Sequence, residues 1–200
     1  MEENNYILSA NKLCYYYQDG EIIRHILKDV TFNFERGKFY TILGESGSGK
    51  TTLLSILSAL EEPKSGSIKY EGKDIRNIGL EKYRRNKIGI IGDMRIIAKN
   101  LLKFVGIDNV KARRQVNRLS GGEQQRVAIA RSLATDVDLL FADEPTGNLN
   151  QEMSDEIVKI FEELAHKHNK CIIMVTHSKE IADKSDCILC LEKGLLKLNE

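Results

Sequence analysis

The sequence predicts an α/β protein with a mainly parallel sheet, helices on both of its faces and a smaller antiparallel sheet formed by the N-terminal strands. Two observations support this fold class. Short apolar runs alternate with segments of helical periodicity, as in parallel sheets that helices cover. The first aromatic and β-branched segments have no helix between them, as in an antiparallel side sheet. At 200 residues, we expect one domain over 1–200.

The elements follow from local patterns. Apolar or β-branched runs ending at glycine or acidic residues predict strands, and apolar residues three or four positions apart predict helices. Residues 67–70 are expected at the edge of the side sheet. The expected strands are 7–17, 30–35, 39–43, 67–70, 87–91, 139–142 and 171–175, and the expected helices are 50–60 and 151–168.

Composition excludes several classes of protein. Hydrophobic residues make up 42% of the chain and charged residues 30%, so a disordered chain is excluded. The net charge of +1 argues against a protein that is basic throughout. No apolar run approaches the roughly 20 residues of a membrane-spanning helix, and the polar, acidic N-terminus does not resemble a secretory signal. We expect a cytoplasmic protein whose four cysteines are reduced and structural.

A glycine-rich loop predicts a phosphate site. Residues 44–51 read Gly-Glu-Ser-Gly-Ser-Gly-Lys-Thr, which fits the pattern G-x-x-x-x-G-K-S/T between a strand and a helix. Its backbone N–H groups and the helix N-terminus form an anion site for a triphosphate. Lys50 would contact the β- and γ-phosphates, Thr51 would offer its hydroxyl to Mg²⁺, and Thr52 would reach the α-phosphate. The alternative is a glycine-rich hairpin that matches by chance. The expected ATP-binding residues here are Gly44, Glu45, Ser46, Gly47, Ser48, Gly49, Lys50, Thr51 and Thr52.

An acidic pair follows the apolar run 139–142. Asp143 at the strand end can hold Mg²⁺ through water, and Glu144 is placed to polarise a water molecule for attack on the γ-phosphorus. The expected position of this pair is on a strand next to that of the phosphate loop. The alternative is an acidic pair that caps a helix at Pro145.

One segment is strongly basic. Residues 76–118 hold twelve lysines and arginines against three acidic residues. A solvated surface, a nucleic-acid site and a face toward anionic lipid are all compatible with this charge. The segment lacks aromatic interleaving and a helix-turn-helix pattern, which argues against nucleic acid as a partner.

Residues 119–131 read Leu-Ser-Gly-Gly-Glu-Gln-Gln-Arg-Val-Ala-Ile-Ala-Arg, which resembles the signature of ATP-binding-cassette (ABC) ATPases. The phosphate loop upstream and Asp143-Glu144 downstream complete the resemblance over nearly the whole chain. Residues 142–149 further resemble the branch serving lipoprotein release, macrolide export, cell division and antimicrobial-peptide export. The resemblance implies a P-loop ATPase subunit of an exporter that uses ATP and Mg²⁺. It also implies a separate transmembrane permease, a position on the inner face of the membrane and an ATP-dependent homodimer.

The resemblance also implies roles for further residues. Ser120, Gly121 and Gly122 of the signature open a helix and so form a second anion site. Together with Glu123 they would contact ATP held by the opposite subunit. His177 resembles the family's switch histidine, which contacts the γ-phosphate and Glu144. Tyr17 lies where the family stacks an aromatic ring on adenine. Because Tyr15 and Tyr16 are adjacent, which of the three tyrosines stacks on adenine stays open. The alternative is that Tyr17 is only a structural residue of the strand.

The chain departs from the family in three places. Lys50 and Leu119 are 69 positions apart, which is short for the family, so 92–118 would be the remnant of a truncated helical subdomain between core segments 1–91 and 119–200. The family's glutamine after the strand 87–91 is absent, and Asp93 is the nearest candidate to meet Mg²⁺. Asn150 stands where the family usually has an aspartate at the dimer interface.

Two other functions stay open at this stage. One is an ATP-binding module with little turnover, because the glutamine and most of the helical subdomain are missing. The other is a soluble ABC ATPase acting on nucleic acid, for which the basic segment 76–118 is the only support.

Overall fold

The computed structural model describes residues 6–91, 137–147 and 149–199 of the chain. The expectations for Asp93, for the segment 92–118 and for the signature residues fall outside this part. They stay predictions from the sequence. The signature residues concerned are Ser120, Gly121, Gly122 and Glu123.

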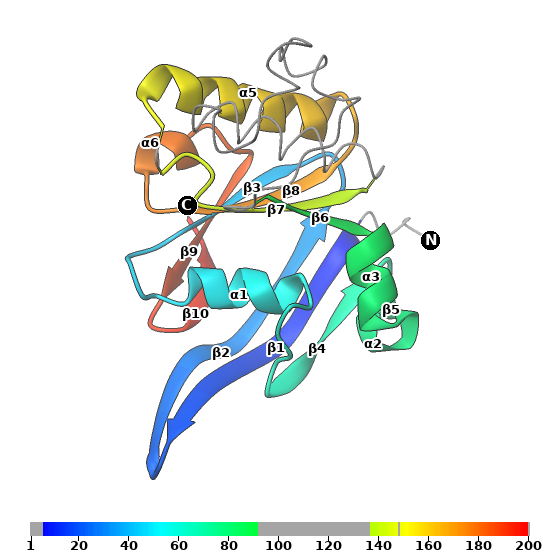
Figure 1. The fold of residues 1–200 in the computed structure, drawn as a ribbon, viewed down its shortest axis with the longest axis vertical. Coiled ribbons are helices and arrows are strands. Elements are labelled where there is room, and N and C mark those ends of the chain that lie inside the picture. The colour runs from blue at the N-terminus through cyan, green and yellow to red at the C-terminus, as the bar shows by residue number, and fades with distance from the viewer. Residues whose placement is uncertain (1–5, 92–136, 148, 200) are drawn as a thin grey trace, which may run out of the picture.

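A six-stranded sheet forms the centre of the molecule, and its strands are parallel except for β10 at one edge (Figure 1). Four of the strands were expected from their apolar runs, and β9 and β10 were not. Their order across the sheet is β10 (Leu195–Leu198), β9 (Cys187–Glu192), β3 (Phe39–Leu43), β8 (Cys171–Thr176), β7 (Leu139–Asp143) and β6 (Ile88–Ile91).

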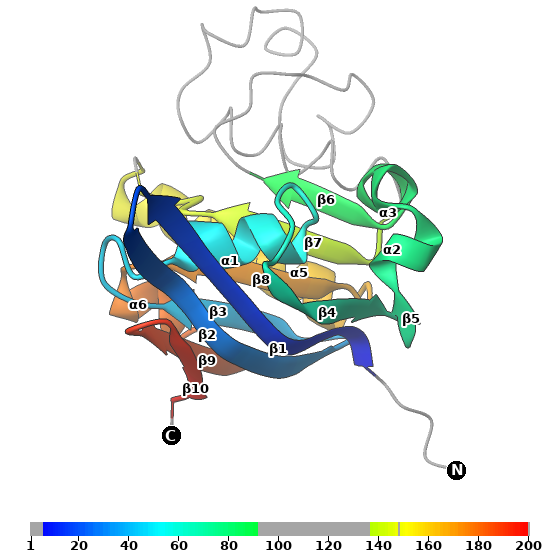
Figure 2. The same ribbon diagram turned by 90° about the horizontal axis from the view of Figure 1, so that it is seen from below.

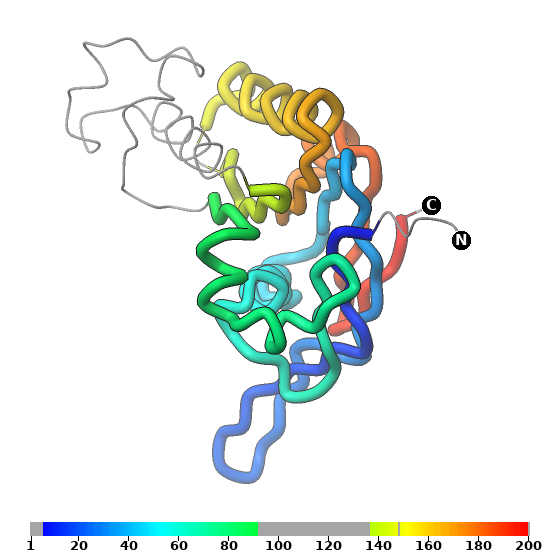
Figure 3. The backbone as a smooth tube through the Cα atoms, turned by 90° about the vertical axis from the view of Figure 1, so that its right-hand side faces the viewer, coloured from blue at the N-terminus to red at the C-terminus, as the bar shows by residue number. Residues whose placement is uncertain are grey.

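The antiparallel sheet was also expected, but it is larger than the sequence indicated. Its order is β2 (Ile22–Glu35), β1 (Tyr6–Asp19), β4 (Ser65–Tyr70) and β5 (Lys73–Asp74). The expectation that 67–70 form the edge is wrong, because β4 pairs with β1 on one side and with β5 on the other. β1 and β2 form a long hairpin that projects from the body of the molecule (Figures 1 and 3) and lies in the foreground of Figure 2.

Two helices cover opposite faces of the central sheet, as Figure 1 shows for α1 (Lys50–Leu57) and α5 (Gln151–His166). The strands between them are buried on both faces because successive side chains of a strand point to opposite sides. In β8, Ile173 belongs to the core on the α1 side, and Ile172 belongs to the core on the α5 side. The core on the α1 side also includes the apolar residues of the antiparallel sheet, so the two sheets share it.

Three short helices complete the described fold: α2 (Ile75–Ile78), α3 (Leu80–Asn86) and α6 (Lys179–Ala182). α1 ends at Leu57, three residues before its expected end, and Ala59 has a positive φ of 57° that no α-helix accommodates. α5 ends at His166, two residues before its expected end. Within the described residues, no helix has the length and apolar character needed to cross a bilayer.

Candidate functional site

The phosphate loop lies between the carboxyl end of β3 and the first turn of α1. Gly49 forms the N-cap of α1 with a φ of 102°, a conformation that residues with a side chain rarely adopt. A Cβ atom there would also lie 2.8 Å from Cγ2 of Ile26, on the hairpin that packs against the loop. Glycine is therefore required at this position for both reasons.

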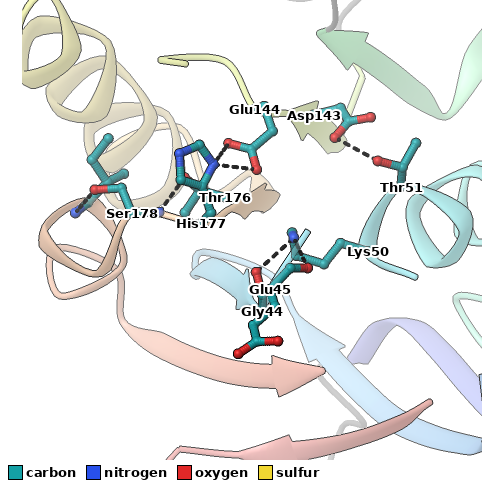
Figure 4. Close-up of polar contacts among 10 residues, drawn as sticks. Gly44, Glu45, Lys50, Thr51, Asp143, Glu144, Thr176, His177 and Ser178 are labelled. Atoms are coloured by element: carbon teal, nitrogen blue, oxygen red, sulfur yellow. Dashed lines mark hydrogen bonds and ion pairs between the residues drawn. The ribbon is translucent and has the colours of Figure 1, made fainter. Parts of the chain in front are cut away.

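Lys50 is held inside the loop. Only 7% of its surface is exposed, and its ammonium group donates hydrogen bonds to the carbonyl oxygens of Gly44 and Glu45, at 2.8 and 2.9 Å (Figure 4). The hydroxyl oxygen of Ser48 is buried and has no hydrogen-bond partner in the described structure. A fixed cation and a spare donor in one glycine-rich loop suit a phosphate ligand.

Thr51 and Asp143 come from different elements and meet at the mouth of the loop. The Thr51 hydroxyl donates to Oδ1 of Asp143 across 3.3 Å (Figure 4). Burial raises the pKa of Asp143, and the negative charge of Glu144 adds to this, while the Thr51 hydrogen bond opposes it. A hydroxyl beside a carboxylate is a donor set that fits Mg²⁺.

The expectation that the acidic pair lies on a strand next to the phosphate loop is wrong. β8 separates β3 from β7, and it is β8 that carries Thr176 and leads into His177. This insertion is what brings the histidine between the loop and the acidic pair. The capping alternative also fails, because α5 begins at Gln151 and takes Asn150, not the acidic pair, as its N-cap.

Glu144 and His177 form a direct pair. Nδ1 of His177 lies 3.0 and 3.1 Å from the two carboxylate oxygens of Glu144 (Figure 4). Glu144 has a φ of 44°, and its N–H donates to the carbonyl of Val175 at 3.0 Å, which fixes this strained backbone to β8. The strained position holds the carboxylate at the edge of the sheet.

Most of the expected site residues that lie in the described part of the chain share one cleft of about 430 Å³. Those that line it are Tyr17, Ser46, Gly47, Gly49, Lys50, Thr51, Thr52, Glu144 and His177. Gly44, Glu45 and Ser48 line a second hollow on the other side of the loop, which His177 also borders. Asp143 joins the cleft through its hydrogen bond to Thr51.

The hairpin settles which tyrosine faces the cleft. Tyr15 is buried and donates its hydroxyl hydrogen to Glu61, and Tyr16 packs against His25. Tyr17 lines the cleft and is 51% exposed, with its ring edge-on to that of Tyr15 at 5.2 Å. Of the three tyrosines, Tyr17 is thus the one that faces the cleft.

Sequence reasoning missed two residues of the cleft, Arg24 and Ile26. Arg24 is the cross-strand partner of Tyr17. Asp19-Gly20 is a hairpin-turn signal that could have indicated this pairing, because a tight turn there brings β2 back along β1.

A parallel sheet that ends in a glycine-rich loop, with a threonine–carboxylate pair and a glutamate–histidine pair around it, defines a P-loop nucleotide-binding protein. The family model described as ABC transporter matches residues 27–147. The chain is 38% identical over 221 aligned positions to an uncharacterized ABC transporter ATP-binding protein, YclH, of Bacillus subtilis, covering 97% of both chains. The chain belongs to the ABC transporter ATP-binding proteins.

Other relatives agree with the expected branch. The chain is 34% identical to the lipoprotein-releasing system ATP-binding protein LolD of Cytophaga hutchinsonii, covering 86% of this chain and 91% of LolD. The dimeric structure of the ABC transporter cassette MJ0796 has a TM-score of 0.85 at 29% identity, covering 95% of this chain and 96% of that one. A second MJ0796 structure, in a post-hydrolysis state with ADP and Pi, has a TM-score of 0.86 at 28% identity, covering 96% of this chain and 98% of that one. The expected family and fold class are confirmed.

Proposed function

We propose that this chain binds and hydrolyses ATP as the catalytic subunit of an ABC exporter, on the inner face of the membrane and together with a separate permease. The observation that carries the proposal is the Glu144–His177 pair, which opens into the same cleft as Lys50. A phosphate loop alone would support nucleotide binding. A positioned carboxylate beside it supports hydrolysis as well.

The residues divide the work as follows. The loop N–H groups and Lys50 hold the phosphates, with Thr52 at the α-phosphate and the Tyr17 ring under the base. Thr51 and Asp143 would hold Mg²⁺, which supplies charge neutralisation at the phosphates when bound. Glu144 orients a water molecule and takes its proton as the water oxygen bonds to the γ-phosphorus and the bond to ADP breaks. His177 fixes the Glu144 carboxylate and reaches toward the γ-phosphate.

A second copy of the chain would complete the site. In this proposal, Ser120, Gly121, Gly122 and Glu123 of one copy contact the ATP bound by the other. The MJ0796 cassette, similar over most of this chain, has a dimeric structure, which supports the arrangement. Asn150 would then lie near the interface, and its described role is to cap α5, where its side chain accepts the N–H of Met153 at 3.0 Å.

We expect turnover to be slow. The family's water-positioning glutamine is absent, and a misplacement of about 1 Å can lower a rate on the order of a hundredfold. Asp93 would repel the γ-phosphate unless Mg²⁺ neutralises it. The alignment with YclH spans more positions than this chain has residues, so YclH carries residues without a counterpart here, which supports an internal shortening.

Single-turnover phosphate release tests the proposal and separates it from a binding module without turnover. The wild type is compared with Glu144→Gln and with a variant carrying a phenylalanine–glutamine pair and a full-length helical segment between Ile91 and Leu101. We expect slow release by the wild type, none by Glu144→Gln and faster release by the restored variant. ATP binding without release in the wild type would leave the chain a binding module.

A further inference from the structure

A break in the pairing of the hairpin lies close to Arg24. Tyr15 pairs with Leu27, but Tyr16 pairs with His25, so Ile26 is an extra residue in β2. Such a bulge shifts the alternation of side chains by one position. Arg24 is the cross-strand partner of Tyr17, so the two side chains share a face of the hairpin, and both residues line the cleft.

The same strand contacts the phosphate loop. The Ile26 side chain packs where a Cβ on Gly49 would be, at the N-cap of α1. Arg24 is two residues further along β2, roughly 7 Å away at the usual rise of a strand. An arginine side chain can span this distance, so its guanidinium can reach a phosphate group held at the start of α1.

The charges of the cleft favour an anionic contact for Arg24. Among the described residues that line the cleft, Arg24 and Lys50 carry the positive formal charges, while Glu144 adds a negative one. Two loop carbonyls already accept hydrogen bonds from the Lys50 ammonium. Within 6–91, 137–147 and 149–199, no hydrogen bond or ion pair engages the Arg24 guanidinium, so its planar donors remain free for a phosphate group.

We infer that Arg24 is a nucleotide-binding residue that contacts the phosphate chain, while its partner Tyr17 takes the base. The inference rests on the proposed nucleotide site and adds a second cation to it. Arg24 on β2 thus binds the phosphates, and Tyr17 on β1 stacks on the base.

Competition experiments with two probes test this division. A fluorescent ATP analogue is displaced from the protein by ATP or by inorganic triphosphate, which has the phosphates but no base. We expect Arg24→Gln to lower the affinity for both competitors by roughly tenfold, which is the effect of losing a charge-assisted hydrogen bond at a partly exposed site. Tyr17→Ala should lower the affinity for ATP and leave the affinity for inorganic triphosphate unchanged. Arg24→Lys should recover part of the loss because it keeps the charge.

Arg85→Gln is the matched control, because Arg85 is an exposed arginine of α3 that does not line the cleft. Thermal unfolding of each variant checks that the fold is intact. Unchanged affinity for both competitors in Arg24→Gln would overturn the inference. A loss of affinity for ATP alone would also overturn it, because that result would place Arg24 at the base or ribose. Failure of the wild type to bind the analogue would instead overturn the proposed nucleotide site.

Discussion

Glu144 and His177 follow the ends of adjacent parallel strands, and the imidazole Nδ1 lies almost equally far from both carboxylate oxygens, at 3.0 and 3.1 Å. A histidine held this way restricts rotation of the carboxylate. The pair therefore acts as a unit in positioning, although in our proposal only Glu144 contacts the attacking water.

Replacing His177 should separate binding from turnover. In His177→Ala the Glu144 carboxylate loses its hydrogen-bond partner, and we expect phosphate release to fall by about a hundredfold, at the lower end for loss of acid–base positioning. ATP affinity should change by less than about threefold, since the phosphate loop is untouched. Stopped-flow phosphate release and nucleotide titration measure the two effects. His25→Ala serves as control, because His25 packs against Tyr16 and does not line the cleft. Equal losses of binding and rate in His177→Ala would contradict this role.

Replacing Lys50 should remove most of the affinity for nucleotide. Lys50→Ala deletes the cation that the loop holds at 2.8 and 2.9 Å from its own carbonyls. We expect the dissociation constant for ATP with Mg²⁺ to rise at least about tenfold, the effect of a lost charge-assisted hydrogen bond. Calorimetric titration measures it, with Lys69→Ala on β4 as an exposed control. Equal affinities of the wild type and Lys50→Ala would show that the loop is not the phosphate site.

Asn150 allows helix capping and dimerisation to be tested apart. Its side-chain oxygen accepts the N–H of Met153, so Asn150→Ala should lower the free energy of unfolding by about 1 kcal/mol. Asn150→Asp keeps the cap and introduces the carboxylate that the family usually has. We expect Asn150→Asp to leave the melting temperature nearly unchanged and to strengthen ATP-dependent dimerisation.

Sedimentation with ATP measures this dimerisation, in a Glu144→Gln background that blocks hydrolysis. The wild-type residue should give a weak dimer. If Asn150→Asp and Asn150→Ala sediment alike, position 150 has no part in the interface.

Local motifs were the part of the site that the sequence could predict. The loop 44–51 and the acidic pair need only a strand, a turn and a helix in order, and all three are encoded nearby. The place of Arg24 in the cleft follows from its cross-strand pairing with Tyr17, which the turn signal Asp19-Gly20 indicates only indirectly, and no short pattern marks the bulge at Ile26. The separation of β3 and β7 by β8 depends on how distant strands pair in space, which spacing along the chain does not specify.

The terminal hairpin was missed for a similar reason. β9 and β10 join through Lys193 and Gly194, both at positive φ, as a tight hairpin turn requires. Lysine is uncommon in that conformation, so Lys-Gly gives a weaker signal than Asn-Gly. A Cβ on Gly194 would lie 2.8 Å from the carbonyl oxygen of Ile26. The turn therefore packs so closely against β2 that only glycine fits at position 194.

Asp138 should make stability depend on pH without affecting the nucleotide site. It precedes β7, at the end of the sheet opposite the cleft, and lies 3.3 Å from both the Arg36 guanidinium and the Lys170 ammonium. Burial disfavours its carboxylate, but these two cations outweigh burial and hold the pKa of Asp138 below its usual value. A carboxyl group whose pKa is lower in the folded state stabilises the protein above its unfolded pKa of about 4. That stabilisation is lost as the pH falls through the lower, folded pKa.

Denaturant unfolding of the wild type and Asp138→Asn at several pH values measures this contribution. At pH 7 the variant should be less stable, because Arg36 and Lys170 lose their shared counter-charge. The difference should shrink as the pH falls below about 4, where the wild-type carboxyl group takes up a proton and resembles the neutral amide. ATP affinity at pH 7 should be the same for both proteins, because the substitution lies at the amino end of β7 and the cleft lies at the opposite end of the sheet. A stability difference that stays constant from pH 7 to acid would mean that Asp138 acts through packing and not through its charge.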